Sequence, residues 1–289
     1  MPETSRRGFA LGALAAGAAL AARPSALLAA AEPALKPITG DARPITRGER
    51  IARVAKAQRL MRQAGLGSIL IEPGASLTYF TGVRWGRSER LTAALIPARG
   101  RTIVFTPFFE EPSVRESLDV PADVRTWVEH EDPLELVARA LRDLKLASLP
   151  VGIEETVRFF AVDGLRKSIP SVEIRNAAPV TRGCRMIKSA AETALMQKAS
   201  DVTVAAYRHT FPRIEKGMSP ADIGAIMNGA TVALGGKPEF ALVLLGEASA
   251  YPHGTGKPQA VREGEVVLMD CGCTVHGYQS DISRTFVFG

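Results

Sequence analysis

The sequence is short of cysteine and of aromatic residues, and each shortage excludes a class of protein. Only three cysteines occur in 289 residues, which excludes a small domain built on disulfides. Cys271 and Cys273 alternate with Gly272 in an apolar segment, a pattern that favours small buried side chains over a metal or redox pair. Aromatic residues make up 6% of the chain, and the net charge is only +6. Without a basic stripe interleaved with aromatics, nucleic-acid binding is not expected.

Long apolar runs and nucleotide-binding loops are also missing. An uncharged Gly/Ala/Leu run near the N-terminus covers the 13 residues from Ala10 to Ala22, whereas a membrane span needs about 20. We therefore expect no stable membrane insertion. No phosphate loop or dinucleotide fingerprint is present in residues 48–178. With 46% apolar and 23% charged residues, the composition is that of an ordinary globular protein of about two domains.

The first 31 residues have the organisation of an export signal. Arg6 and Arg7 precede the uncharged run, and three alanines ending at Ala31 precede Glu32. A charged segment, an apolar segment and a small-residue cleavage site follow one another in such signals. The paired arginines resemble a twin-arginine signal. We expect cleavage near Ala31 and a periplasmic or secreted protein; an uncleaved anchor is the alternative.

Helical and strand patterns alternate between residues 48 and 178, after a proline-containing linker at 32–47. The pattern predicts a helix from about Ile51 that stops at Gly65. A hairpin is predicted over 91–105, around the turn residues 97–100. Asp132 and Pro133 predict the start of a helix that reaches about Leu146. Alternating elements of this kind indicate an α/β domain with a mixed or parallel sheet.

The segment from 179 to 289 begins with helices and continues with strands. Ser189 and Glu192 form a capping-box pattern for a helix to about Phe211, and Ser219 starts a second helix that Gly235 ends. Strands are predicted at 240–245, 265–273 and 280–288. The sequence stops directly after the last apolar strand, so we expect this second domain to be incomplete.

Two aspartates lie in these apolar strands, where a carboxylate is costly unless it is compensated. A hairpin turn centred between Val275 and His276 would place Asp270 directly opposite Asp281, with Cβ atoms about 5 Å apart. A shared proton or a bound cation would relieve the repulsion, and oxygen ligands suit hard or intermediate divalent ions. The alternative is two separate aspartates at strand ends, and a bulge at Gly277 would shift the register.

His253 lies in a turn-rich loop at 250–254. A single histidine in such a loop is usually only solvated, and the same interpretation applies to His130, His209 and His276.

Three stretches around these residues together resemble the pita-bread metallopeptidases. They are 252–254, 264–272 and 277–286, and the spacings of 17 residues from His253 to Asp270 and 11 to Asp281 fit that family. The family comprises Xaa-Pro aminopeptidases, Xaa-Pro dipeptidases (prolidases) and creatinase. Residues 185–192 resemble the start of its catalytic domain, and 48–178 its N-terminal domain. The implied fold class is α/β: a creatinase-type N-terminal α/β domain at 48–178, then the first half of a pita-bread (α+β) catalytic domain at 179–289.

The resemblance also implies a site and a substrate. Asp270 and Asp281 correspond to ligands of two divalent metal ions that activate a water, and His253 to a residue that holds the substrate or the developing oxyanion. Manganese is the first expectation, with cobalt, zinc and iron as alternatives. The implied partners are a proline-containing peptide and a second copy of the chain in a homodimer.

The family's three further ligands, a histidine and two glutamates, have no counterpart that can be assigned in this sequence. We therefore expect the chain alone to be inactive and poorly stable. Two alternatives are a creatinase-like, metal-independent C–N hydrolase and a non-catalytic pita-bread binding protein. Retention of Asp270 and Asp281 argues against the first, and retention of both aspartates and of His253 argues against the second. Aminopeptidase and dipeptidase activity are not distinguished by these residues.

Overall fold

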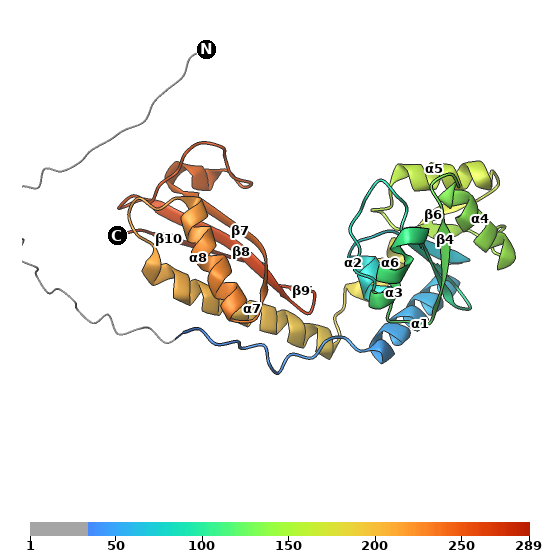
Figure 1. Ribbon diagram of the computed structural model, residues 1–289, viewed down its shortest axis with the longest axis horizontal. Helices are drawn as coiled ribbons and strands as arrows, with labels where there is room; N and C mark the ends of the chain where they lie inside the picture. Colours follow the sequence, from blue (N-terminus) through green and yellow to red (C-terminus); the bar gives the residue numbers. More distant parts are fainter. Residues whose placement is uncertain (1–33) are drawn as a thin grey trace, which may run out of the picture. The chain divides into compact units, whose positions relative to one another are not determined.

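The computed structural model describes residues 34–289 (Figure 1). The predicted export signal at 1–31 lies outside these residues. Among the described helices, none combines the length and the apolar character that crossing a membrane requires.

The N-terminal half is built on a mixed six-stranded sheet with the order β4-β3-β2-β1-β5-β6. Its strands are β1 (Ser68–Ile71), β2 (Ala93–Pro97), β3 (Thr102–Pro107), β4 (Ala122–Trp127), β5 (Val151–Ile153) and β6 (Ile174–Asn176). β2 pairs antiparallel with β1 and β3, whereas β3–β4, β1–β5 and β5–β6 are parallel. The predicted mixed sheet and the predicted hairpin are both confirmed.

Helices cover both faces of this sheet, which explains why its central strands read as continuous apolar runs. The helices are α1 (Arg47–Gln63), α2 (Ala75–Thr81), α3 (Glu111–Ser117), α4 (Pro133–Asp143), α5 (Phe159–Ser168) and α6 (Ala178–Arg185). One apolar core lies under α4 and α5 and includes Leu95, Leu141 and Leu165. The other lies under α1, α2 and α6 and includes Met61 and Phe80.

Local capping explains where α4 begins and ends. The Asp132 carboxylate accepts a hydrogen bond from the Leu134 amide at 2.8 Å, and Pro133 occupies the first turn, as the sequence predicts. The helix ends at Asp143 rather than near Leu146. Lys145 adopts a left-handed φ of 57°, which ends the helical backbone.

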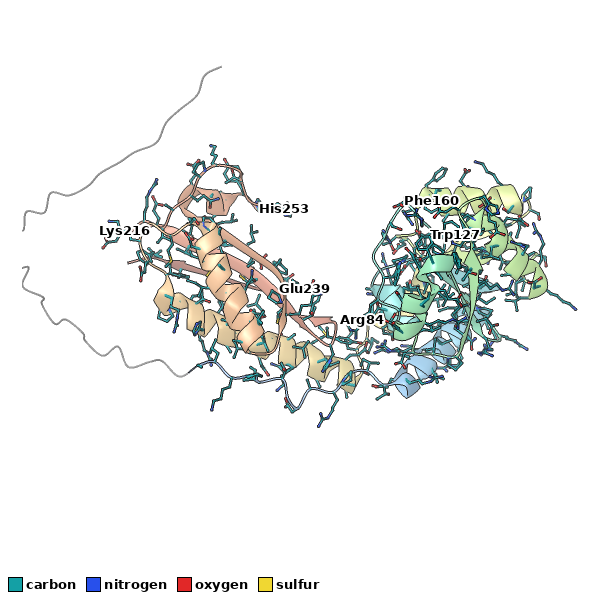
Figure 2. The ribbon with its side chains drawn as sticks, viewed as in Figure 1. Arg84, Trp127, Phe160, Lys216, Glu239 and His253 are labelled. Carbon is teal, nitrogen blue, oxygen red and sulfur yellow. The ribbon has the colours of Figure 1, made fainter. Side chains whose placement is uncertain are left out.

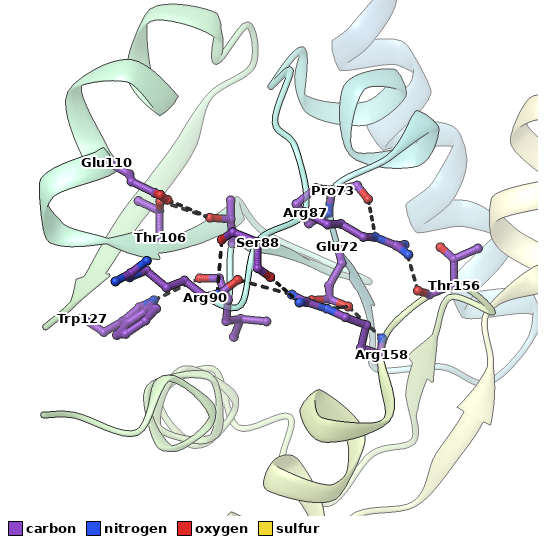
Figure 3. A network of polar contacts seen from close by, with 12 residues as sticks. Glu72, Pro73, Arg87, Ser88, Arg90, Thr106, Glu110, Trp127, Thr156 and Arg158 are labelled. Carbon is purple, nitrogen blue, oxygen red and sulfur yellow. Dashed lines mark hydrogen bonds and ion pairs between the residues drawn. The ribbon is translucent and has the colours of Figure 1, made fainter. Parts of the chain in front are cut away.

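A buried carboxylate, Glu72, ties three loops of this half together (Figure 3). Its side chain is 0% exposed and accepts from the Arg158 guanidinium at 2.7 Å; the Arg158 amide donates to the other carboxylate oxygen at 2.7 Å. The same guanidinium donates to the carbonyls of Ser88 and Arg90. Arg87 donates to the carbonyl of Pro73 at 3.0 Å. The irregular segment 83–91 is therefore held by arginines instead of by a strand or helix.

The predicted linker at 32–47 makes contacts with the C-terminal half. The Ile38 amide donates to the Leu234 carbonyl at 3.0 Å, and Asp41 pairs with Lys198 at 2.9 Å. The hydrogen bond from Lys198 lowers the pKa of the Asp41 carboxyl. Part of this proline-containing segment is thus fixed to the helices that follow.

The C-terminal half consists of two helices packed on one face of an antiparallel sheet (Figure 1). Its elements are α7 (Ala190–Thr210), α8 (Pro220–Ala233), β7 (Lys237–Leu245), β8 (Val266–Val275), β9 (Tyr278–Gln279) and β10 (Ile282–Val287). β8 is central, with β7 on one side and β9 and β10 on the other. Capping boxes at Ser189 and Ser219 start both helices, as predicted. The α/β half followed by an α+β half confirms the predicted fold class.

Candidate metal centre

The register between β8 and β10 places Asp270 opposite Ser283, not opposite Asp281. The turn consists of His276 and Gly277, with φ of 48° and 83°. Two consecutive positive φ values are typical of a type I′ hairpin turn, whose twist matches that of the flanking strands. The turn therefore lies one residue later than the direct pairing requires, and that pairing is wrong. No bulge occurs at Gly277.

The two aspartates nevertheless share one face of the sheet. Asp281 lies between β9 and β10 and is exposed, as is Ser283 two residues later. Residues two apart in an extended chain point to the same side, so Asp281 lies on the side of Ser283, the β10 partner of Asp270. Asp281 is then the diagonal neighbour of Asp270, a relation that separates residues by about 7–8 Å. A pair at this spacing leaves room for an ion between the carboxylates.

The strands approach closely at Gly272, between the two aspartates. A Cβ at this position would lie 2.3 Å from the Ser280 carbonyl oxygen and 2.6 Å from the Phe240 ring. Only glycine fits such a distance without movement of the backbone. Gly272 thus sets how closely the strands of Asp270 and Asp281 approach each other.

The carboxylates have few partners on this open face. Ser283 Oγ donates to Asp270 Oδ1 at 2.9 Å. Within residues 34–289, the Asp281 carboxylate has no hydrogen bond or ion pair, and no Lys or Arg side chain pairs with Asp270. Two neighbouring carboxylates without a cationic side chain fit a divalent ion, which prefers oxygen ligands.

The opposite face of the same strands is buried and fixed by α7. The Tyr207 hydroxyl lies 2.9 Å from the Met269 carbonyl and 2.7 Å from the Ile282 carbonyl. Ser280 Oγ hydrogen-bonds Thr203 Oγ1 at 2.7 Å. The three cysteines are free and buried, and burial raises the pKa of the Cys271 thiol to about 11. The prediction of small buried cysteine side chains is confirmed.

His253 is exposed and projects from the loop between β7 and β8 (Figure 2). A Cβ at the next residue, Gly254, would lie 3.5 Å from Leu242 and 3.7 Å from Leu244. Leu242 is the β7 partner of Asp270, so this loop lies on the aspartate face. A groove of about 690 Å³ runs between His253, β7 and α8.

The described residues 34–289 contain no group of three or more His, Cys, Asp or Glu side chains that could hold a metal. Asp270 and Asp281 by themselves do not make up such a group, and both stay predicted ligands. The sequence pattern did not identify Ser283, whose hydroxyl donates to Asp270. Ser283 follows Asp281 by two residues, and this period of two was the available signal.

Comparisons with known proteins match both halves of the chain. Residues 53–187 match the creatinase/prolidase N-terminal domain, and residues 194–289 match metallopeptidase family M24. The structure of the dipeptidase PepE from Mycobacterium ulcerans superposes with a TM-score of 0.76 at 30% identity, over 86% of this chain and 67% of that one.

Two curated peptidases are also similar to this chain over more than four-fifths of its length. An uncharacterized peptidase of Schizosaccharomyces pombe is 32% identical over 86% of this chain and 57% of its own length. A Xaa-Pro dipeptidase of Pyrococcus horikoshii is 26% identical over 82% of this chain and 64% of its own length. The chain thus spans about three-fifths of the length of these curated relatives.

Proposed function

The chain belongs to the pita-bread metallopeptidases of family M24 and carries their creatinase-type N-terminal domain, and we propose that it supplies two ligands of a dinuclear metal centre that hydrolyses Xaa-Pro peptide bonds. The observation that carries this proposal is the placement of Asp270 and Asp281 on one open strand face without a cationic partner. A metal-independent C–N hydrolase would not require this pair.

Each residue of the face has a role in the proposed reaction. Asp270 and Asp281 hold the ions, which when bound supply an activated water for attack on the scissile carbonyl. Ser283 engages one Asp270 oxygen and leaves the other free for a ligand bond. His253, beside the groove, binds the substrate carbonyl and stabilises the charge that develops on its oxygen.

The remaining features of the proposal follow from the sequence and the relatives. We propose manganese as the metal, a proline-containing peptide as substrate and a homodimer as the assembly. We also propose export by the twin-arginine signal to the periplasm or the medium. Peptide substrates are supported by the similarity to the Xaa-Pro dipeptidase of Pyrococcus horikoshii.

Asp270→Asn and Asp281→Asn are each expected to weaken Mn²⁺ binding by the chain at least about ten-fold, because each removes a charged oxygen ligand. Binding is measured through the electron paramagnetic resonance signal of free Mn²⁺. Asp201→Asn, an exposed position on α7, is the matched control and leaves the affinity unchanged. Mn²⁺ binding that survives both site substitutions, or no Mn²⁺ binding at all, would contradict the proposed centre.

The chain by itself is expected to release no proline from a Xaa-Pro dipeptide in the presence of Mn²⁺ or Co²⁺, because two carboxylates hold two ions poorly. Proline release is followed by chromatography, with a full-length Xaa-Pro dipeptidase as the positive control. Metal-dependent hydrolysis that Asp270→Asn abolishes would overturn the expectation of inactivity while it supports the proposed reaction.

Ser283→Ala is expected to lower Mn²⁺ affinity about ten-fold, as loss of a hydrogen bond to a metal ligand commonly does. Ser283→Thr keeps the hydroxyl and retains the affinity of the unmodified chain. Equal affinities for the alanine and threonine variants would show that the Ser283 hydroxyl does not orient Asp270.

A further inference from the structure

A buried polar cluster links the first helix of the N-terminal half to the hairpin that precedes Asp281. We call it the hairpin anchor and define it as Arg53 of α1, Glu192 of α7 and Tyr278 of β9. The side chains of Arg53 and Glu192 are 9% and 5% exposed, and Arg53 Nη2 lies 3.2 Å from Glu192 Oε1. None of the three residues belongs to the candidate metal centre.

The polar groups of the three side chains are hydrogen-bonded to one another. Arg53 Nη2 donates to the Tyr278 hydroxyl at 2.8 Å, and that hydroxyl donates to Glu192 Oε1 at 2.9 Å. Arg53 also donates to the Tyr79 carbonyl at 3.2 Å, and its guanidinium lies 4.1 Å from the centre of the Tyr79 ring. The other Glu192 oxygen accepts from the Ser189 amide in the capping box of α7. Burial raises the pKa of Tyr278 to about 12, so its hydroxyl keeps the proton that it donates.

Tyr278 is the first residue after the two-residue turn and pairs with Val275. The Ser280 amide then donates to the Cys273 carbonyl at 2.9 Å, and Asp281 follows. Residues 278 and 280 point to the buried face, where α7 and α1 hold them, and residue 281 points to the open face. Whatever fixes Tyr278 therefore also fixes the position from which Asp281 projects.

We infer that Arg53 and Glu192 are positioning residues that act through Tyr278 to hold Asp281 beside Asp270. This inference rests on the proposed function, because it assigns the cluster a role toward the metal ligands. The creatinase-type half thereby contributes to the metal centre of the other half through α1.

The test measures amide hydrogen exchange in the whole chain for three variants. Tyr278→Phe removes one hydroxyl and leaves the Arg53–Glu192 pair in place, and Arg53→Met removes the charge. Each is expected to speed amide exchange of residues 278–282 at least about ten-fold. Loss of a hydrogen bond to a charged group changes an opening equilibrium by about this factor. Exchange in β2 and β3, residues 93–107, is expected to stay unchanged for Tyr278→Phe.

Arg50→Met is the matched control, since Arg50 also lies in α1 and is also buried. Its guanidinium contacts Asp119 and the Thr78 carbonyl, both within the N-terminal half. This variant is expected to leave exchange at 278–282 unchanged. Unchanged exchange there for Tyr278→Phe, or an equal increase over both halves, would overturn the inference.

Mn²⁺ affinity separates the inference from the proposed function. Tyr278→Phe is expected to weaken Mn²⁺ binding about ten-fold, which is typical of substitutions at residues that orient a metal ligand. Arg50→Met is expected to leave the Mn²⁺ affinity unchanged. If Asp270→Asn does not alter Mn²⁺ binding, the proposed function fails, whatever the exchange shows. If Asp270→Asn weakens binding but Tyr278→Phe does not, the proposed function stands and the positioning role is contradicted.

Discussion

Arg158→Met is expected to destabilise the N-terminal half by about 3 kcal/mol, since breaking a buried ion pair by removal of one partner costs about 3–5 kcal/mol. The lower value applies because Arg158 is 28% exposed, whereas Glu72 is fully buried. The substitution leaves the Glu72 carboxylate with a single backbone donor, the amide of residue 158. It also releases the carbonyls of Ser88 and Arg90 that the guanidinium holds.

Tryptophan fluorescence during urea unfolding measures the free energy of unfolding of the N-terminal half. The chain has two tryptophans, Trp85 and Trp127, and both lie in the N-terminal half. Arg182→Met is the matched control, because Arg182 and Glu155 form an ion pair with side chains 63% and 42% exposed. Such exposed pairs contribute about 0–1 kcal/mol.

A double variant checks the physical cause. Glu72→Gln added to Arg158→Met removes the uncompensated charge, so it is expected to recover part of the lost free energy of unfolding. If Arg158→Met costs no more than Arg182→Met, or if the second substitution adds to the loss, the buried carboxylate is not the source of the effect.

Gly272→Ala is expected to destabilise the C-terminal sheet by about 1–3 kcal/mol, the usual cost of adding a methyl group to a filled site. The new Cβ would meet the Ser280 carbonyl oxygen at 2.3 Å, and a backbone atom cannot turn away as a side chain can. The strands of Asp270 and Asp281 must then separate, so Mn²⁺ binding is expected to fall together with the stability.

Hydrogen exchange of residues 266–287 and a Mn²⁺ titration measure both consequences. Gly229→Ala is the matched control, because Gly229 lies on the exposed side of α8 and a Cβ there meets nothing within 4 Å. In a helix interior this change is expected to stabilise by up to about 1 kcal/mol. Slow exchange in residues 266–287 of Gly272→Ala, with unchanged Mn²⁺ affinity, would contradict the role given to Gly272.

Local interactions explain which elements could be predicted from the sequence. The caps at Asp132, Ser189 and Ser219 bind amides two or three residues away, and alternating apolar residues mark the strands. Signals of this range are complete within a short segment, so α4, α7, α8 and the β2–β3 hairpin were predictable, whereas the short helices α2, α3 and α6 were not. The end of α4 was not predictable, because the residue that adopts the left-handed backbone there is Lys145 and not a glycine.

The position of a two-residue turn is harder to predict from sequence than the strands beside it. His276 adopts a positive φ that a non-glycine residue rarely takes. Because the turn therefore consists of His276 and Gly277, Ser283 lies opposite Asp270. A shift of the turn by one residue would change every cross-strand pair, although each strand would keep its own pattern. The aspartates were identifiable from their apolar strands and spacing, while their diagonal arrangement required the folded sheet.

By itself, the sequence determined the two-part α/β and α+β organisation, the starts of α4, α7 and α8 and the identity of the two candidate ligands. Only the tertiary structure decided which distant side chains meet: Glu72 with Arg158, and Arg53 with Glu192 and Tyr278. These partners lie 86 to 225 residues apart, so no local pattern specifies them. Their pairing follows from burial, because a charged group removed from water requires a partner, and the packing of the whole chain decides which one lies within reach.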